Sequence, residues 1–138
     1  MSSLLRNLLA LLSGALAAGV IIIVIETMGA MAYPPPPGFD PRNAAAMRIF
    51  IASLPVGAFL YILAAYLAGT FTGVFVATRF SLRRPARQGW LLGLVFLISG
   101  VVNFLKYPHP AWFVAASLAA FLGATWFGVR LGRPRLPA

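Results

Sequence analysis

The sequence predicts an all-α membrane protein with four transmembrane helices, arranged as two hairpins with both termini on one side. Two observations predict this fold. The composition is 61% hydrophobic and only 9% charged, whereas soluble domains carry about 25% charged residues. The apolar residues are also gathered into four blocks, each near or above the roughly 20 residues that a helix needs to cross a bilayer core. Alternating strands of the kind that build a membrane β-barrel do not occur.

The first span is expected at about residues 8–32, within a single domain that comprises residues 1–138. Consecutive prolines at residues 34–37 end it, because they lack amide donors and favour polyproline II. Arg6 and the small residues 30–32 resemble parts of a signal peptide. However, the apolar run from residue 8 to residue 25 is 18 residues long, whereas the usual h-region has about 7–15. We therefore expect an uncleaved first span.

A second long apolar segment follows the prolines and is expected to break at Pro55. Asp40 is predicted as the N-cap and Pro41 as the first helical residue. A straight helix over residues 43–78 would be about 54 Å long, which exceeds the hydrocarbon core of about 30 Å. Because proline removes one helical hydrogen bond, we expect an outer interfacial helix at about residues 41–54 and a second span at about residues 56–78.

The third and fourth spans are expected at about residues 89–105 and 111–131. The connection between them, residues 106–110, is short and contains two prolines. A weak internal repeat predicts that the two hairpins are related by an axis along the membrane normal. Its two matches pair residues 33–36 with 107–110 and residues 70–74 with 125–129.

The basic residues predict the orientation in the membrane. Net charge is +9, which in a membrane protein reflects topology and anionic headgroups rather than nucleic acid. Eight basic residues fall on the side of the termini: Arg6, Arg79, Arg83, Arg84, Arg87, Arg130, Arg133 and Arg135. Three fall on the other side: Arg42, Arg48 and Lys106. The positive-inside rule then places both termini in the cytoplasm of a bacterium, with the chain in the inner membrane.

Glu26 is the first candidate functional residue, because it is one of two acidic residues in the chain and interrupts the first apolar run. An acidic group at the bilayer centre costs about 2.5–3.5 kcal/mol, and less near an interface. It therefore needs a partner, water or a proton. A proton or cation site and a structural polar cluster are both open interpretations. The predicted site comprises Glu26, Arg48, Asn103, Lys106 and His109, with Arg42 as a further possible ion-pair partner.

Small residues at four-residue spacing predict where helices pack closely. The predicted packing positions are Gly69, Gly73, Gly89, Gly93, Gly128 and Gly132. Contacts within one chain are the favoured interpretation. A homodimer face is the alternative, because such spacings also occur at helix dimer interfaces.

Four arginines between the second and third spans form a basic cluster. The favoured interpretation is a topology anchor, and binding of anionic lipid is the alternative. The cluster comprises Arg79, Arg83, Arg84 and Arg87.

The sequence predicts neither an enzyme nor a cofactor. It contains no Ser–His–Asp pattern, phosphate-binding loop or HExxH motif. With one histidine, two acids and no cysteine, a metal site is not expected. Asn103 is interpreted as an interhelical hydrogen-bonding residue and His109 as structural.

Four motifs resemble those of a group of uncharacterised small bacterial inner-membrane proteins with four spans. The motifs are Glu26-x-x-Gly29, Tyr33-Pro34-Pro35-Pro36, Ala52-Ser53-Leu54-Pro55-x-Gly57 and Pro108-His109-Pro110-x-Trp112-Phe113. This resemblance implies the architecture but no activity. The chain is also loosely similar to small multidrug resistance transporters, whose first helix carries a glutamate that binds substrate or protons. Glu26 lies later in its span, however, and the proline-rich loop and the strong charge bias depart from that family.

Two functions follow as hypotheses. The first is a non-enzymatic accessory or scaffold component of the inner membrane, with the lipid bilayer as its environment and a homo-oligomer or larger membrane complex as its partner. The alternative is a small proton-coupled transporter with Glu26 as the titrating site. A cavity that reaches an unpaired Glu26 would favour transport, whereas a paired and enclosed Glu26 would favour a structural role.

Overall fold

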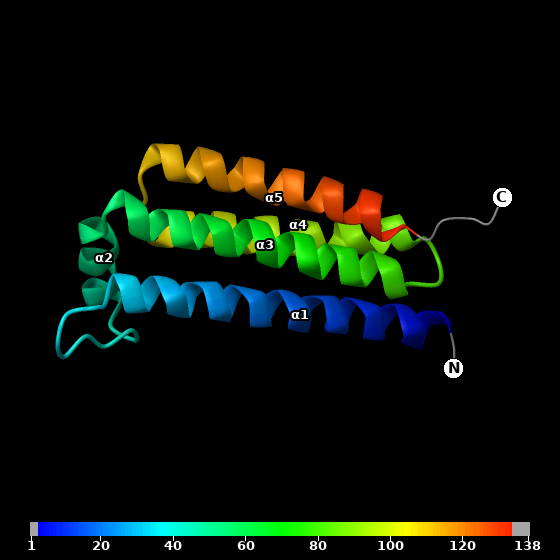
Figure 1. Cartoon of the computed structure of the whole chain (residues 1–138), viewed down its shortest axis with the longest axis horizontal. Coiled ribbons are helices and arrows are strands. Elements are labelled where there is room, and N and C mark those ends of the chain that lie inside the picture. The colour runs from blue at the N-terminus through cyan, green and yellow to red at the C-terminus, as the bar shows by residue number, and fades with distance from the viewer. Residues whose placement is uncertain (1–2, 134–138) are drawn as a thin grey trace.

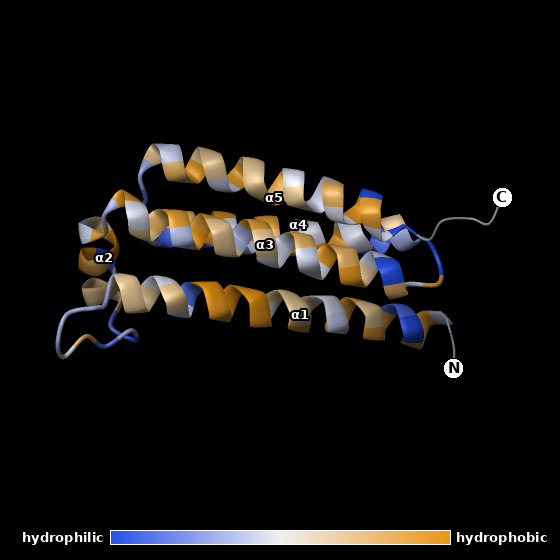
Figure 2. Cartoon of the chain, viewed as in Figure 1, coloured by the Kyte–Doolittle hydropathy of each residue, from blue (hydrophilic) through white to orange (hydrophobic). Residues whose placement is uncertain are grey.

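The computed structural model describes residues 3–133, which form five helices and no strand. The helices are α1 (Ser3–Ala32), α2 (Ala44–Ser53), α3 (Val56–Phe80), α4 (Pro85–Lys106) and α5 (Ala111–Gly132). All except α2 are long and apolar enough to cross a membrane, which indicates a multi-pass membrane protein (Figure 2). The predicted all-α fold with four long apolar helices is confirmed.

The long helices extend beyond the predicted spans, mainly at one end of the molecule. α1 begins at Ser3 and has 30 residues, so it is about 45 Å long at 1.5 Å per residue. α4 begins at Pro85, because proline is suited to the first helical turn, where no amide donor is needed. These extensions carry Arg6 and Arg87 on regular helix rather than on loops.

The N-terminus of α2 corrects the predicted cap. Asn43, not Asp40, is the N-cap, and its side-chain Oδ1 accepts hydrogen bonds from the backbone amides of Ala45 at 3.0 Å and Ala46 at 3.2 Å. Asp40 Oδ1 instead accepts from the Arg42 amide at 2.9 Å. This bond to residue i+2 stabilises a turn, so the helix begins only after that turn is complete. At the other end of α2 the chain breaks at Pro55, and α3 begins at Val56.

The four long helices lie side by side and alternate in direction (Figure 1). α3 is central and packs against α1, α4 and α5, whereas α1 and α5 are not in contact. α2 lies across one end of the bundle, and its backbone packs against none of the long helices within residues 3–133. We call this the loop end, because the segment 33–43, α2 and residues 107–110 lie there.

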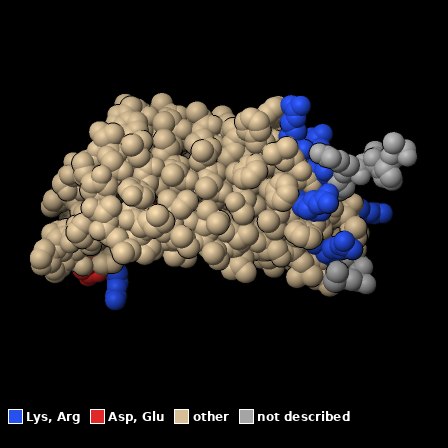
Figure 3. All heavy atoms as spheres, in the orientation of Figure 1, with Lys and Arg blue, Asp and Glu red and all other residues tan. Residues whose placement is uncertain are grey.

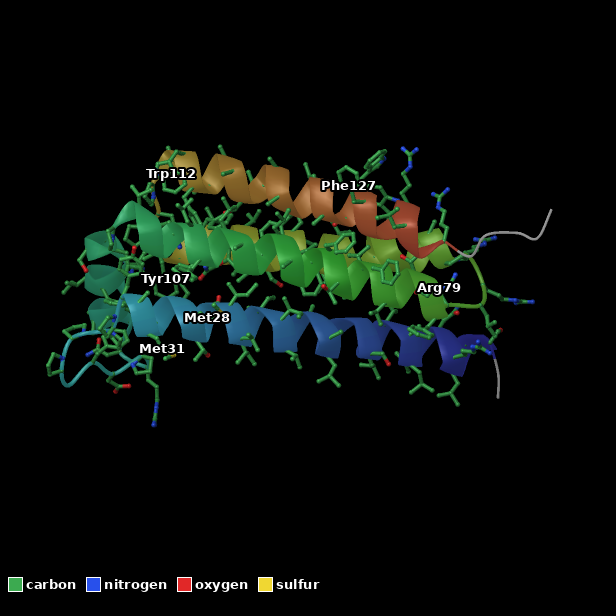
Figure 4. The ribbon with its side chains drawn as sticks, in the orientation of Figure 1. Met28, Met31, Arg79, Tyr107, Trp112 and Phe127 are labelled. Carbon is green, nitrogen blue, oxygen red and sulfur yellow. The ribbon has the colours of Figure 1, made fainter. Side chains whose placement is uncertain are left out.

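The opposite end, which we call the basic end, carries most of the positive charge (Figure 3). The arginines there are Arg6, Arg79, Arg83, Arg84, Arg87, Arg130 and Arg133. Arg135 lies outside the described residues. Arg42, Arg48 and Lys106 belong to the loop end, together with Tyr107 and Trp112, which lie at the far end of the bundle from Arg79 (Figure 4). The structure thus shows the predicted separation of charge between the two ends.

Glycines allow the helices to approach closely. A Cβ atom on Gly73 of α3 would lie 2.8 Å from both the Ala18 Cβ and the Gly14 carbonyl oxygen of α1. A Cβ on Gly128 of α5 would lie 2.9 Å from a methyl group of Val74. The six glycines predicted to pack helices are all buried, so these ridges are covered within one chain: Gly69, Gly73, Gly89, Gly93, Gly128 and Gly132.

Aromatic rings fill the half of the bundle nearer the loop end. Phe113 is fully buried and its ring centroid lies 4.9 Å from that of Phe59 and 5.9 Å from that of Phe104. Tyr66 stacks on Phe121 at 5.0 Å. The two halves therefore pack differently, with small residues near the basic end and rings near the loop end.

The substitution Gly14→Val tests the close approach of α1 and α3. A Cβ at this position would lie 2.5 Å from the Gly73 carbonyl oxygen, so the helices must separate. We expect a loss of about 1–3 kcal/mol in stability, as for other overpacked interiors. Thermal unfolding of the purified protein in detergent measures it. Gly19→Val is the matched control on the same helix, because nothing lies within 4 Å of its Cβ; equal losses in both variants would contradict the packing argument.

Candidate functional site

A cavity of about 470 Å³ lies at the loop end, and Glu26 lines it. Gly29 and Ala30 of α1 also line it, together with Tyr33, which directly follows this helix and whose amide donates to the Gly29 carbonyl oxygen. These positions are i, i+3, i+4 and i+7, which lie on one face of a helix. The apolar sequence of α1 therefore directs one polar side chain and one ring into the same space.

The other walls come from α2, α3 and the segment before α2. They consist of Pro35, Phe39, Pro41, Met47, Phe50, Leu54, Ala58, Tyr61 and Ile62. Apart from Glu26 and the two tyrosine hydroxyl groups, the side chains of this pocket are apolar. We call it the Glu26 pocket.

Two aromatic pairs form much of the lining. Tyr33 and Tyr61 meet edge to face, with ring centroids 6.3 Å apart and an angle of 68° between the ring planes. Phe39 and Phe50 lie 4.9 Å apart with a tilt of 47°. Such geometries are favourable for aromatic pairs, so four rings from three segments, namely residues 33–43, α2 and α3, are held around one cavity.

Two glycines make room for the tyrosines. A Cβ on Gly29 would lie 2.9 Å from the Tyr61 Cβ, and a Cβ on Gly57 would overlap the Tyr33 hydroxyl group. Each tyrosine thus lies against the backbone of the opposite helix. This gives a structural reason for the glycines in the motifs Glu26-x-x-Gly29 and Pro55-x-Gly57.

Glu26 itself is exposed on the isolated chain. No hydrogen bond or ion pair reaches its carboxyl group from any residue between 3 and 133. It lies six residues before the end of α1 at Ala32, or about 9 Å along the helix axis. A carboxyl group at this depth in an apolar wall favours a proton or a bound cation as its partner.

A hydrogen bond joins α3 and α4 inside the bundle. The Asn103 side-chain amide donates a hydrogen bond to the Tyr66 hydroxyl oxygen at 3.3 Å. The Glu26 carboxylate is close enough to this hydroxyl group to interact with it electrostatically. The direct contact is thus between α3 and α4, and Glu26 of α1 acts on it only through its charge. The sequence analysis did not single out Tyr66, although a tyrosine within an apolar span usually finds a hydrogen-bond partner.

The structure does not bring the remaining predicted polar residues to Glu26. Arg48 is exposed on α2 and is not part of the pocket lining. Lys106 Nζ lies 5.2 Å from the ring centroid of Tyr107. His109 Nδ1 donates to the Tyr107 carbonyl oxygen at 2.8 Å, and its ring stacks on Phe113 at 5.4 Å. These contacts give His109 a packing environment apart from the carboxyl group.

The structure divides the predicted arginine cluster into two places. Arg83, Arg84 and Arg87 line one hollow beside the N-terminal end of α1. Arg79, in the last turn of α3, lines a separate recess with Arg133. Arg79 is therefore close to the other three arginines in the sequence but lines a different hollow in the structure.

The Glu26 pocket has the chemistry of a site for an organic cation. A single carboxyl group supplies negative charge, and aromatic faces attract cations through their π electrons. A bare metal ion would need several oxygen or nitrogen ligands. The described residues contain no group of three His, Cys, Asp or Glu side chains that could hold one.

No protein-family model, curated protein or solved structure matches this chain. The function is therefore argued from the residues of the pocket and from the fold.

Tyr66→Phe tests the hydrogen bond between α3 and α4. It leaves the Asn103 amide without its acceptor, so we expect a loss of about 0.5–1.5 kcal/mol in stability. Thermal unfolding in detergent measures this loss. Tyr61→Phe, on the same helix, is the control, because no hydrogen bond to its hydroxyl group occurs within residues 3–133. A Tyr66→Phe protein as stable as the control would show that the bond adds nothing.

Proposed function

We propose that this multi-pass membrane protein binds a hydrophobic organic cation in the Glu26 pocket and exchanges it for a proton. The observation that carries the proposal is an unpaired carboxyl group that lines a cavity of about 470 Å³. An unpaired carboxyl group beside a cavity favours transport, whereas a paired and enclosed carboxyl group would favour a structural role. The volume is within the range of about 300–1,000 Å³ that is typical of small-molecule sites.

The lining defines the class of ligand. Tyr33, Tyr61, Phe39 and Phe50 offer ring faces and edges to an apolar body, while Glu26 neutralises one positive charge. A cation over an aromatic face gains about 0.5–2 kcal/mol. Quaternary ammonium and phosphonium ions combine a delocalised charge with apolar substituents, and they match this combination of walls.

Proton exchange follows from the same carboxyl group. When Glu26 is protonated it has no charge and attracts a cation weakly, and when it is ionised it binds the cation. Ligand and proton therefore compete for one group, as a coupled transporter requires. The loose similarity to small multidrug resistance transporters agrees with this interpretation. Transport across the membrane would also need a second access route, which a partner copy in a homo-oligomer would supply.

The membrane and orientation belong to this proposal. With the seven described arginines of the basic end in the cytoplasm, the Glu26 pocket faces the outer side of a bacterial inner membrane. A cation arriving from outside would then reach the pocket directly.

A non-enzymatic accessory or scaffold role is the second proposal, and the surface of α1 supports it. α1 packs mainly on α3 and does not contact α5. Gly19 on this helix has open space at its Cβ position, so another membrane helix can approach closely there. The large apolar side chains exposed on the helix include Leu8, Leu12, Leu16, Ile23 and Met31.

Glu26→Gln tests cation binding. The purified protein is titrated with tetraphenylphosphonium by isothermal calorimetry in a neutral detergent. We expect binding to the unsubstituted protein that weakens as the pH falls, because protonation removes the carboxylate. Binding should release a proton, measured as a dependence of the heat on the buffer. Glu26→Gln should weaken binding by at least about tenfold, since it removes the neutralising charge.

Asp40→Asn is the matched control for this experiment. Asp40 is the other carboxylate of the chain, and it lies next to pocket residues without lining the pocket. An asparagine there keeps the oxygen that accepts from the Arg42 amide. Equal loss of binding in both variants would show diffuse attraction to the loop end, and undiminished binding in Glu26→Gln would overturn the proposed site. Either result would favour the accessory role.

A further inference from the structure

The basic end contains a hollow of about 550 Å³ that three arginines line. It lies between the first turns of α1, the connection from α3 to α4, and the first two turns of α4. Among residues 3–133, its lining consists of Leu4, Asn7, Arg83, Arg84, Arg87, Gln88 and Leu91. We call it the arginine cleft. It is remote from the Glu26 pocket, because the two lie at opposite ends of the bundle.

Neither of the two acidic side chains of this chain lies near these arginines. The acidic residues are Glu26 and Asp40, and both lie toward the loop end. Arg6 and Glu26 are separated by 20 residues of α1, or about 30 Å, which exceeds the Debye length of about 8 Å at physiological salt. Within residues 3–133 none of the three guanidinium groups in the cleft has an ion-pair partner. Within the part of the chain that the structure describes, these guanidinium groups are therefore available to an anion from another molecule.

Asn7 holds the walls of the cleft together. Its Oδ1 accepts hydrogen bonds from the amides of Leu82 at 3.1 Å and Arg83 at 3.4 Å, and its amide donates to the Arg83 carbonyl oxygen at 3.3 Å. These three bonds connect α1 to the segment between α3 and α4. They fix the backbone of Arg83 beside α1, so the cleft is a built feature and not an accident of long side chains.

The start of α4 adds positive potential to the same place. Arg84 is its N-cap, with a left-handed φ of 51°, and it makes no side-chain capping bond. Pro85 has no amide hydrogen, and the amides of Arg87 and Gln88 donate to the Arg84 carbonyl oxygen, so the positive end of the helix dipole is the main contribution of this terminus. A helix N-terminus attracts anions, phosphate groups in particular, and here it acts together with three guanidinium groups.

We propose that the arginine cleft binds the phosphate group of an anionic phospholipid. Guanidinium groups form paired hydrogen bonds with phosphate oxygens, and Asn7 and Gln88 supply further polar groups at the rim. Leu4 and Leu91 supply an apolar wall on which the first carbons of an acyl chain can lie. A free phosphate ion would use the arginines and leave these leucines unused. This combination assigns the lipid rather than a soluble anion.

The second basic recess provides an internal comparison. It has a volume of about 400 Å³ and is lined by Phe75, Arg79, Leu131 and Arg133. It has two arginines, no amide side chain and no helix N-terminus. Both hollows lie at the basic end and face the same headgroup region, so general attraction to a negative surface acts on both alike.

The double substitution Arg83→Gln with Arg87→Gln tests the proposal. The full chain, purified in a neutral detergent, is titrated with phosphatidylglycerol, and bound lipid is counted by native mass spectrometry. This variant removes two of the three guanidinium groups that pair with the phosphate oxygens. We therefore expect at least about tenfold weaker binding of the first lipid. The matched control, Arg79→Gln with Arg133→Gln, removes the same charge from the recess and should change binding by less than about threefold.

Three further measurements separate the sources of binding. Phosphatidylcholine should bind at least tenfold more weakly than phosphatidylglycerol, and inorganic phosphate at millimolar concentration should not displace the lipid. Leu91→Asn should weaken lipid binding although it removes no charge. Equal losses in the two double variants would show diffuse attraction, and displacement by inorganic phosphate would show a soluble-anion site. Either outcome overturns the proposal. Thermal unfolding of each variant confirms that a folded protein is compared.

Discussion

The close approach of α1 and α3 determines the shape of the molecule. In a bilayer the hydrophobic effect does not draw helices together, so packing of small residues must do so. Gly14 and Gly73 bring the two backbones together near the middle of the bundle. The same seam continues to Gly29 and Gly57, where it seats Tyr61 and Tyr33 in the walls of the Glu26 pocket. The spacing of one helix pair thus controls both stability and the geometry of the candidate site.

Polar groups inside the bundle fall into two kinds. Thr78, Ser81 and Thr125 donate their hydroxyl hydrogens to carbonyl oxygens one turn earlier in their own helices, so they need no partner from another helix. Asn103 and Glu26, in contrast, project toward other helices. Asn103 finds Tyr66, but Glu26 finds no bonded partner within residues 3–133. The buried hydroxyl groups of Thr70 and Ser117 also have no partner among the described residues. Glu26 differs from them because its charged group is exposed and lines a cavity, and this sets it apart as a binding group.

The features of the fold that could be predicted from the sequence are those that depend on neighbouring residues. The long apolar blocks predicted the four long helices, and proline predicted the break at Pro55, because each of these features is determined by the residues next to it. The predicted N-cap of α2 was wrong because Asp40 and Asn43 are equally good capping residues. In the structure Asp40 stabilises a turn, and the helix begins only after it. The pocket rings of Phe39, Phe50 and Tyr61 could not be predicted, since they come from three segments whose inward faces depend on packing. For the same reason the sequence could not separate Arg79 from the arginine cleft.

The charge separation along the bundle also determines how the chain is oriented in a membrane, and therefore which molecules each end can contact. Moving one elementary charge through a membrane potential of 100 mV changes its energy by about 2.3 kcal/mol. For the arginines of the basic end together, this amounts to more than 10 kcal/mol, besides the cost of desolvating them. An inserted chain therefore cannot invert. The arginine cleft and the loop end, where the Glu26 pocket lies, therefore face opposite headgroup regions, and each meets its own set of ligands.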